Sequence, residues 1–404
     1  MINNTEFDVA VVGAGPAGSV AARFASENGL KVILLEKKKK PGLKLCAGGL
    51  PNPIMRNFGV DKDAIECSVA NFLLHTHATG WHSTPSRGAA TTYRTTIENE
   101  DFKRLDYQLA INAEENGAKV ITSAEVTDMA TKGSRVKLSI RTPSSGRIVT
   151  AKIVLGADGF NSIIAKSTNL WRRYKKDRIV IAVQREVLTE KKNQDLNCYN
   201  IYDEKIAKVG YLWIYPKSRG FTIGLGCLAS YIVEPLKSVL ERAIRTNPLI
   251  KEIIPHGSKF LPLEGAPIPT EPLKKIYSDN VMLLGDAARH VNPMTWGGIY
   301  NAMVDGKLAS EVAAEAISKG DYSERLLKAY QEKWYETIGK QLIWEREKFE
   351  RVSKEFVRHF ELLISLLRNR YATRLAKATS NNFPKLASFL PSPLLDKLIM
   401  YGWI

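Results

Sequence analysis

The first part of the chain alternates between apolar runs and a segment rich in glycine and alanine. The residues from Phe7 to Val12 (FDVAVV) and from Lys31 to Leu35 (KVILL) are short apolar runs, typical of buried strands in a parallel sheet. Between them, the residues from Ser19 to Asn28 are predicted to form a helix whose small alanines face the sheet, and Gly29 ends it. The order strand, helix, strand predicts an α/β unit.

A glycine-rich turn, GAGPAG, joins the first strand to this helix. Gly13 permits the tight turn, Gly15 lets the backbone approach a pyrophosphate, and Gly18 allows close packing of helix on strand. The helix N-terminus offers free N–H groups and partial positive charge to phosphates. Glu36, at the end of the second strand, can accept hydrogen bonds from a ribose hydroxyl. We therefore predict a dinucleotide site; a glycine-rich turn that binds no ligand is the alternative. The predicted binding residues here are Gly13, Gly15, Ala17, Gly18, Glu36 and Lys37.

Two later apolar runs also end in glycine and aspartate. The run from Ile153 to Asp158 ends in GADG, and the run from Val281 to Asp286 ends in GDAA. Gly297, Gly298 and Ile299 then open a predicted helix that continues through Ala309. An aspartate at such a strand end can bind a ribityl hydroxyl, and N–H groups at the helix start can stabilise negative charge on a reduced flavin. These segments favour FAD over NAD.

The motifs GAGPAG, GADG and GDAA, in this order, resemble those of glutathione-reductase-type flavoproteins of the p-hydroxybenzoate hydroxylase fold. The resemblance implies bound FAD. Arg104, in the segment from Phe102 to Asp106, resembles the arginine that lies along the ribityl and phosphate chain in that fold; a surface helix residue is the alternative. The further predicted cofactor-binding residues are Cys46, Ala47, Gly49, Arg104, Val126, Asp158, Gly285, Asp286, Gly297, Gly298 and Ile299.

Two stretches are more specific. The segment from Lys44 to Leu50 (KLCAGGL) resembles the K-x-C-x-G-G motif of the geranylgeranyl reductases. The segment from Tyr211 to Pro216 resembles their Y-x-W-x-F-P motif, with Tyr215 replacing phenylalanine, and the strand from Phe221 to Gly226 also fits. The resemblance spans roughly residues 5 to 345. It implies reduction of isoprenoid C=C bonds by reduced FAD, in archaeal ether lipids or in the tail of chlorophyll. Our preferred interpretation is an archaeal enzyme acting on membrane-lipid precursors.

The aromatic motif is compatible with an apolar substrate. Side chains alternate along a strand, so Tyr211, Trp213 and Tyr215 share one face and could form a flat wall beside the flavin. We predict these three as substrate-binding residues. The alternative is an ordinary packed sheet face.

Cys46 is the predicted catalytic residue. Reduction of a C=C bond needs a hydride at one carbon, here from flavin N5, and a proton at the other. A thiol is a candidate acid because its pKa is not far above neutral and responds to its surroundings. Gly48 and Gly49 would let the loop lie close against the isoalloxazine. A buried, inert cysteine is the alternative.

The remaining pattern predicts a mixed α/β (α+β) fold with three regions. Residues 1–60, 100–177 and 276–320 form a discontinuous Rossmann-like FAD-binding domain. Residues 61–99 and 178–275 form an antiparallel β substrate domain with one helix near Ser238 to Arg245, and residues 321–404 form a helical C-terminal region. The stretch from Lys348 to Arg370 has an apolar face that includes Phe356, Phe360, Leu363 and Leu367 at helical spacing. Its role, and that of the proline-interrupted stretch from Phe383 to Ile404, is membrane contact or a structural cap or dimer contact.

The net charge of the chain indicates which classes of partner it could bind. The formal net charge is +16, which attracts nucleic acid, anionic lipid or an acidic protein, unless it only reflects a solvated surface. No nucleic-acid module is recognisable. We therefore expect an anionic membrane surface as a partner, and a cytoplasmic protein peripheral to the inner face of the cell membrane. The electron donor stays open between ferredoxin, NAD(P)H and others.

Other features predict little further chemistry. The four cysteines are widely spaced, so neither disulfides nor a zinc site is expected. His75, His77 and His82 are interpreted as residues of a surface strand rather than metal ligands. The polar N-terminus argues against a signal peptide, and the longest apolar runs are too short for a transmembrane helix.

Two other functions are alternatives to this interpretation. A flavin-dependent monooxygenase or halogenase could share the fold, since halogenases carry a W-x-W-x-I-P segment, although no clear candidate for their lysine stands out. A membrane-bound carrier of electrons to quinone would usually recruit an iron–sulfur cluster, which these cysteines cannot ligate.

Overall fold

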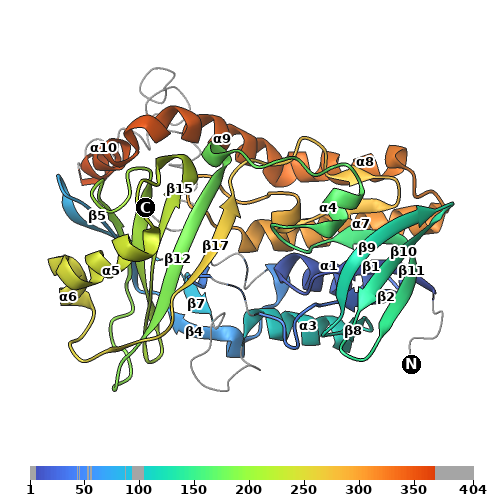
Figure 1. Ribbon diagram of the computed structural model, residues 1–404, viewed down its shortest axis with the longest axis horizontal. Coiled ribbons are helices and arrows are strands. Elements are labelled where there is room, and N and C mark those ends of the chain that lie inside the picture. Colours follow the sequence, from blue (N-terminus) through green and yellow to red (C-terminus); the bar gives the residue numbers. More distant parts are fainter. Residues whose placement is uncertain are drawn as a thin grey trace. The chain divides into compact units, whose positions relative to one another are not determined.

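The computed structural model describes residues 6–368 except 43, 45, 52, 53, 55, 56, 87 and 93–103. The chain divides into two compact units (Figure 1). The first comprises the described residues of 1–44, 98–175 and 268–346, and the second those of 45–97, 176–267 and 347–404. The division differs from the sequence-based domains mainly at three places. The described residues of 45–60 belong to the second unit, residues 268–275 belong to the first, and the described residues of 321–404 are divided between the two.

The first unit is built on a mixed sheet. Its strand order is β18-β19-β11-β1-β2-β8, with β9 and β10 extending from β11. β1, β2, β11 and β19 run parallel, whereas β9 and β10 are antiparallel. The bounds are β1 Glu6–Val12, β2 Val32–Leu35, β8 Lys119–Ile121, β9 Glu125–Lys132, β10 Arg135–Arg141, β11 Gly146–Gly156, β18 Tyr277–Ser278 and β19 Val281–Leu283.

Helices α1 (Pro16–Glu27) and α7 (Ile299–Lys319) pack closely in this unit. A Cβ on Gly306 of α7 would lie 2.4 Å from the carbonyl oxygen of Ala17, so only glycine permits the crossing. α1 begins three residues before the predicted Ser19, because Pro16 suits the first helical turn. α7 extends beyond the predicted Ala309 to Lys319, and Gly320, with a φ of 64°, caps it. The other helices here are α3 (Leu105–Glu115), α4 (Ile163–Ser167) and α8 (Glu324–Trp334).

The second unit carries a larger, mostly antiparallel sheet of order β16-β12-β15-β14-β13-β5-β6, with β17 also paired to β12. Within it, β13 and β5 pair in parallel. A small sheet, β3-β7-β4, accompanies it. The bounds are β3 Gly49–Leu50, β4 Ile65–Ser68, β5 Asn71–Thr76, β6 Gly80–Pro85, β7 Ala90–Thr92, β12 Ile179–Leu188, β13 Cys198–Tyr202, β14 Gly210–Lys217, β15 Gly220–Leu228, β16 Lys259–Phe260 and β17 Glu264–Pro269.

One face of this sheet is an apolar core. Leu212, Ile214 and Ile223 pack there with Val239 and Leu240 of helix α5 (Leu236–Thr246). Helix α6 (Pro248–Ile253) follows α5 (Figure 1), so the region holds two helices where one was predicted. Asn247 separates them because its side chain accepts from the amide of Leu249 and starts the new helix. Alternation places Tyr211, Trp213 and Tyr215 on the opposite face.

Within the described residues, the predicted helical C-terminal region is interrupted by a short turn. Helix α9 (Lys340–Val352) and helix α10 (Phe356–Arg368) are separated by a 3-10 turn, Ser353–Glu355. The turn redirects the chain so that the Phe360 ring stacks on Tyr202 of β13 at 3.9 Å between centroids. The predicted tail from Phe383 to Ile404 lies outside the described residues. Among the helices that are described, none combines the length and apolar character needed to cross a bilayer.

Candidate active site

The glycines of the first βα turn have different structural requirements. Gly13 has a φ of 100°, and a Cβ there would lie 2.4 Å from the carbonyl oxygen of Ala157. A Cβ on Gly18 would lie 1.9 Å from the carbonyl oxygen of Gly13. Gly15, the N-cap of α1, has an ordinary φ of −79° and open space where its Cβ would be. Neither packing nor conformation explains glycine at 15, whereas approach of a phosphate does.

Glu36 is held beside this turn. One carboxylate oxygen accepts from the amide of Ala14 at 2.8 Å, and the other accepts from the amide of Lys38 at 2.9 Å. The residue is 9% exposed, so its carboxylate is fixed before any ligand binds. Of the other residues predicted near here, Ala17 and Val126 are buried, and Lys37 is exposed.

Asp286 and the start of α7 form a second cluster in the same unit. Asp286 is ion-paired with Lys44, and a Cβ on Gly298 would lie 3.7 Å from an Asp286 carboxylate oxygen. Gly298 is the N-cap of α7, next to Ile299, and Gly297 is exposed. A Cβ on Gly285 would meet both Ala17 and Ala302, so the cluster lies where α1 and α7 pack together.

A buried pair that the sequence analysis missed supports this cluster. The carboxylate of Asp305, inside α7, accepts from the amide of Gly285 and lies 2.8 Å from Nδ1 of His290. The His290 ring stacks on Trp334 at 4.2 Å. An aspartate within an apolar helical segment was the available signal, because such a residue needs a buried partner.

Two other predicted cofactor residues have clear structural contacts. One carboxylate oxygen of Asp158 accepts from the amides of Ile163 and Ile164, which caps α4. Burial raises the pKa of Asp158, although these hydrogen bonds oppose the change. Arg104 is 7% exposed at the N-cap of α3, and its side chain packs against Gly42.

These residues fit an FAD molecule. The first turn of α1 contains no acidic side chain, so its positive end is free to face phosphates. Gly15 leaves room for a pyrophosphate, and Glu36 is fixed to accept from a ribose. The Asp286 and Gly298 cluster would hold the ribityl and flavin end.

The second unit brings together the predicted substrate residues. The rings of Tyr211 and Trp213 meet edge to face at 5.9 Å, and Tyr211 also contacts Tyr202. A Cβ on Gly224 would lie 2.2 Å from the Trp213 indole, so the glycine on β15 makes the space that the indole fills. With Tyr202 and Phe360, these side chains form one continuous aromatic cluster.

The Cys46 loop lies on this same face of the sheet. Gln184 of β12 donates a hydrogen bond to the carbonyl oxygen of Cys46 at 3.0 Å. A Cβ on Gly49 would lie 3.1 Å from the ring of Tyr215. The Cys46 sulfur is half-buried and accepts from the amide of Gly48 at 3.3 Å. Thus Cys46, Ala47 and Gly49 belong to the unit of the aromatic residues.

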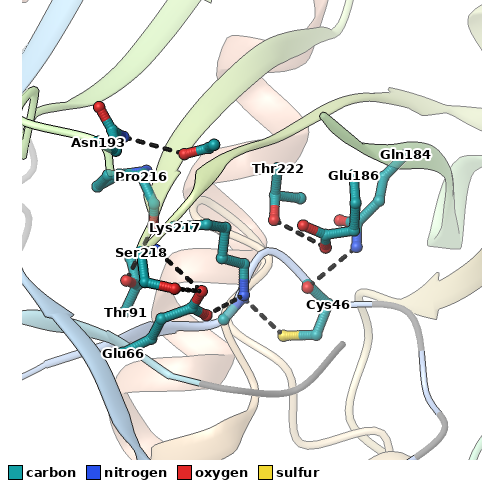
Figure 2. Close-up of polar contacts among 12 residues, drawn as sticks. Cys46, Glu66, Thr91, Gln184, Glu186, Asn193, Pro216, Lys217, Ser218 and Thr222 are labelled. Carbon is teal, nitrogen blue, oxygen red and sulfur yellow. Dashed lines mark hydrogen bonds and ion pairs between the residues drawn. The ribbon is translucent and has the colours of Figure 1, made fainter. Parts of the chain in front are cut away.

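A buried polar cluster lies beside the Cys46 sulfur (Figure 2). The ammonium of Lys217 lies 3.0 Å from a carboxylate oxygen of Glu66, and Thr222 donates to Glu186 at 2.9 Å. Burial would lower the pKa of Lys217, but the charges of Glu66 and Glu186, the hydrogen bond to Glu66 and the proximity of Cys46 together raise it. Figure 2 shows the ammonium pointing toward the sulfur.

Lys217, Glu66, Glu186 and Gln184 were not predicted as site residues from the sequence. The alternation that put the three aromatic residues on one face also puts Lys217 there, and Gln184 and Glu186 alternate on β12 in the same way. That pattern was a usable signal. His75 instead contacts Trp81, and within the described part of the chain no group of His, Cys, Asp or Glu is placed to hold a metal.

Comparisons with known proteins agree with this geometry. Residues 6–343 match the FAD binding domain family. The digeranylgeranylglycerophospholipid reductase 2 of Methanopyrus kandleri is 34% identical over 346 residues, covering 83% of this chain and 84% of the relative. The chain belongs to the digeranylgeranylglycerophospholipid reductase family.

Solved structures support the same assignment. A geranylgeranyl bacteriochlorophyll reductase-like protein from Thermoplasma acidophilum has a TM-score of 0.82 at 25% identity, covering 96% of this chain and 99% of that one. The flavin-dependent brominase Bmp2 has a TM-score of 0.70 at 18% identity over 98% of both chains, which shows the fold alone. As a member of the reductase family, the protein is an FAD-dependent oxidoreductase. The mixed α/β fold and the FAD cofactor predicted from sequence are confirmed.

The substitution Gly15→Ala should weaken FAD binding by about 10- to 100-fold, because the new methyl group would occupy the space that the pyrophosphate needs. Alanine is a poorer N-cap residue than glycine, by about 1 kcal/mol, but its Cβ would meet open space, so the apoprotein should stay folded. Fluorescence titration of apoprotein with FAD measures the change. Gly146→Ala on β11, where a Cβ would meet only a carbonyl oxygen at 4.0 Å, is the control. Unchanged affinity in Gly15→Ala would mean that the phosphates lie elsewhere.

Proposed function

We propose that this reductase saturates the C=C bonds of geranylgeranyl chains in archaeal ether-lipid precursors. Bound and reduced FAD would supply the hydride for each double bond. One observation carries the proposal beyond family membership. A half-buried thiol, Cys46, and an aromatic cluster, Tyr211 with Trp213, occupy the same face of one sheet. A surface for an apolar chain and a proton donor are the two things that this reaction requires of the protein.

The residues have distinct tasks in this reaction. The aromatic cluster forms an apolar wall against which the isoprenoid binds, and it excludes water from the double bond. Cys46 provides the proton for the carbon that receives no hydride. Gln184 fixes the loop through the Cys46 carbonyl oxygen, and Gly49 allows close packing against Tyr215.

Mass spectrometry tests the function directly. A geranylgeranylated glycerophospholipid is incubated anaerobically with dithionite-reduced protein, and a gain of two hydrogens per double bond is the expected product. Parallel reactions with reduced ferredoxin and with NAD(P)H identify the electron donor. Flavin that stays reduced beside an unchanged lipid would contradict the proposal. NADPH and oxygen consumption with an aromatic substrate would instead favour a monooxygenase.

Trp213→Ala should impair reduction of long isoprenoids more than it impairs FAD binding. Trp213 is 6% exposed, so its loss leaves a cavity that costs about 3–5 kcal/mol of stability. Rates are therefore compared on folded, flavin-loaded protein, with Trp213→Phe as the variant that keeps an aromatic ring. Equal losses of FAD and of activity would mean that the indole only supports the sheet.

We further propose that the protein binds the anionic inner surface of the cell membrane peripherally. The net charge of +16 provides the attraction. Flotation with anionic vesicles should be lost near molar salt, where the Debye length falls to about 3 Å. Equal flotation with neutral vesicles would refute the electrostatic part. Deletion of residues 383–404 tests whether the tail contributes.

A further inference from the structure

Lys217 is a fully buried cation on the sheet face that carries the Cys46 loop. Its side chain is 0% exposed and that of its ion-pair partner Glu66 is 2% exposed. The other oxygen of Glu66 accepts from the amide and the hydroxyl of Ser218, at 3.0 and 3.1 Å. The carboxylate is thus fixed by the backbone and in turn fixes the ammonium. Such a buried pair seldom adds net stability compared with apolar residues, so stability alone does not account for it.

The ammonium lies between the Glu66 carboxylate and the Cys46 sulfur (Figure 2). Four titratable groups from three strands act on this region: Lys217 and Tyr211 from β14, Glu66 from β4 and Glu186 from β12. The negative charges of both carboxylates stabilise the Lys217 ammonium, and this ammonium faces the Cys46 sulfur. A positive charge therefore faces the sulfur in Figure 2.

We propose that Lys217 is a positioning residue for Cys46, whose ammonium stabilises the thiolate that remains when the thiol has given up its proton. This proposal rests on the proposed function. In the step, the S–H bond breaks and its proton forms the new C–H bond at the carbon that receives no hydride. The electron pair stays on sulfur, opposite the ammonium. A proton from water then restores the thiol before the next double bond is reduced.

The interaction can be measured without turnover. Oxidised, FAD-loaded protein is alkylated with iodoacetamide between pH 6 and pH 10, and modification of Cys46 is followed by peptide mass spectrometry. Cys67, Cys198 and Cys227 are buried and provide internal references. Only the thiolate reacts, so the pH midpoint reports its stability and the high-pH plateau reports access to the sulfur.

The charges near the Cys46 sulfur predict how the pH midpoint of alkylation should change from one variant to the next. Lys217→Met should raise the midpoint by about one to two pH units, which makes alkylation near neutral pH roughly 10- to 100-fold slower. Glu66→Gln should lower the midpoint, because it removes a negative charge. Lys217→Arg should stay near the wild type. The double variant Lys217→Met/Glu66→Gln should have a midpoint above that of the wild type. Because it leaves no unpaired buried charge, it also controls for misfolding of Lys217→Met. Lys237→Met, on an exposed position of α5, is the control.

An unchanged midpoint in both Lys217→Met and the double variant would overturn the proposal. A changed plateau with an unchanged midpoint would also overturn it, because Lys217 would then only support the loop. A parallel assay of lipid reduction distinguishes failure of this proposal from failure of the proposed function. If the midpoints follow the predicted order while wild-type protein reduces no geranylgeranyl lipid, the pairing of Lys217 with Cys46 stands and the proposed function fails.

Discussion

Cys46→Ser should lower the rate of lipid reduction by about 10²- to 10⁴-fold, the usual contribution of a positioned general acid. Serine preserves the size and shape of the side chain, but a hydroxyl is a far weaker acid than a thiol. The loop is held by Gln184 through the main chain, so the substitution should not displace it. FAD content should stay normal. The measurement is a single-turnover rate of double-bond saturation by pre-reduced enzyme.

Cys67→Ala is the matched control for this prediction. Cys67 lies on β4 beside Glu66, and burial first of all raises its pKa to about 11, so this thiol stays protonated and unreactive at neutral pH. Its removal should leave the rate unchanged. A wild-type rate in Cys46→Ser would mean that water or another side chain delivers the proton. An altered product pattern at an intact rate would mean that Cys46 positions the isoprenoid.

Local patterns along the chain predicted the elements of the FAD-binding unit well. The spacing of Gly13 and Gly18 reflects the contacts of one turn, and the start of α7 at Ile299 reflects the glycines before it. Such features depend on residues close together in sequence, where sterics and hydrogen bonding leave few alternatives. Residues that are not required by this local geometry, such as Gly15, then point to a ligand.

Contacts between distant segments could not be predicted in the same way. Gln184 and Cys46 are 138 residues apart, and Ser218 and Glu66 are 152 apart. Alternation indicates which face of a strand carries Lys217 but does not indicate which carboxylate it meets. Likewise, the GADG motif identified Asp158 as a polar residue at a strand end. Its hydrogen bonds to the amides that begin α4 depend on how the chain continues beyond it.

Lys217→Met should lower the free energy of unfolding by about 3–5 kcal/mol, because it leaves the Glu66 carboxylate buried without its ammonium. The double variant Lys217→Met/Glu66→Gln should recover most of this loss, since the amide oxygen of the introduced glutamine can still accept from Ser218. Urea denaturation of FAD-saturated protein, followed by circular dichroism, measures both variants. Lys237→Met, which is exposed, should change stability by less than about 0.5 kcal/mol.

The pH dependence of this difference identifies its cause. The pKa of Lys217 is raised above the ordinary lysine value of 10.5 in the folded protein. Its stabilising contribution is therefore fully present below the unfolded-state pKa and is lost as the pH rises through the higher folded-state pKa. The stability gap between wild type and Lys217→Met should stay constant from pH 7 to about pH 10 and shrink above it. A gap that persists undiminished at higher pH would arise from packing of the lysine's methylene groups, and the double variant would then remain as unstable as the single one.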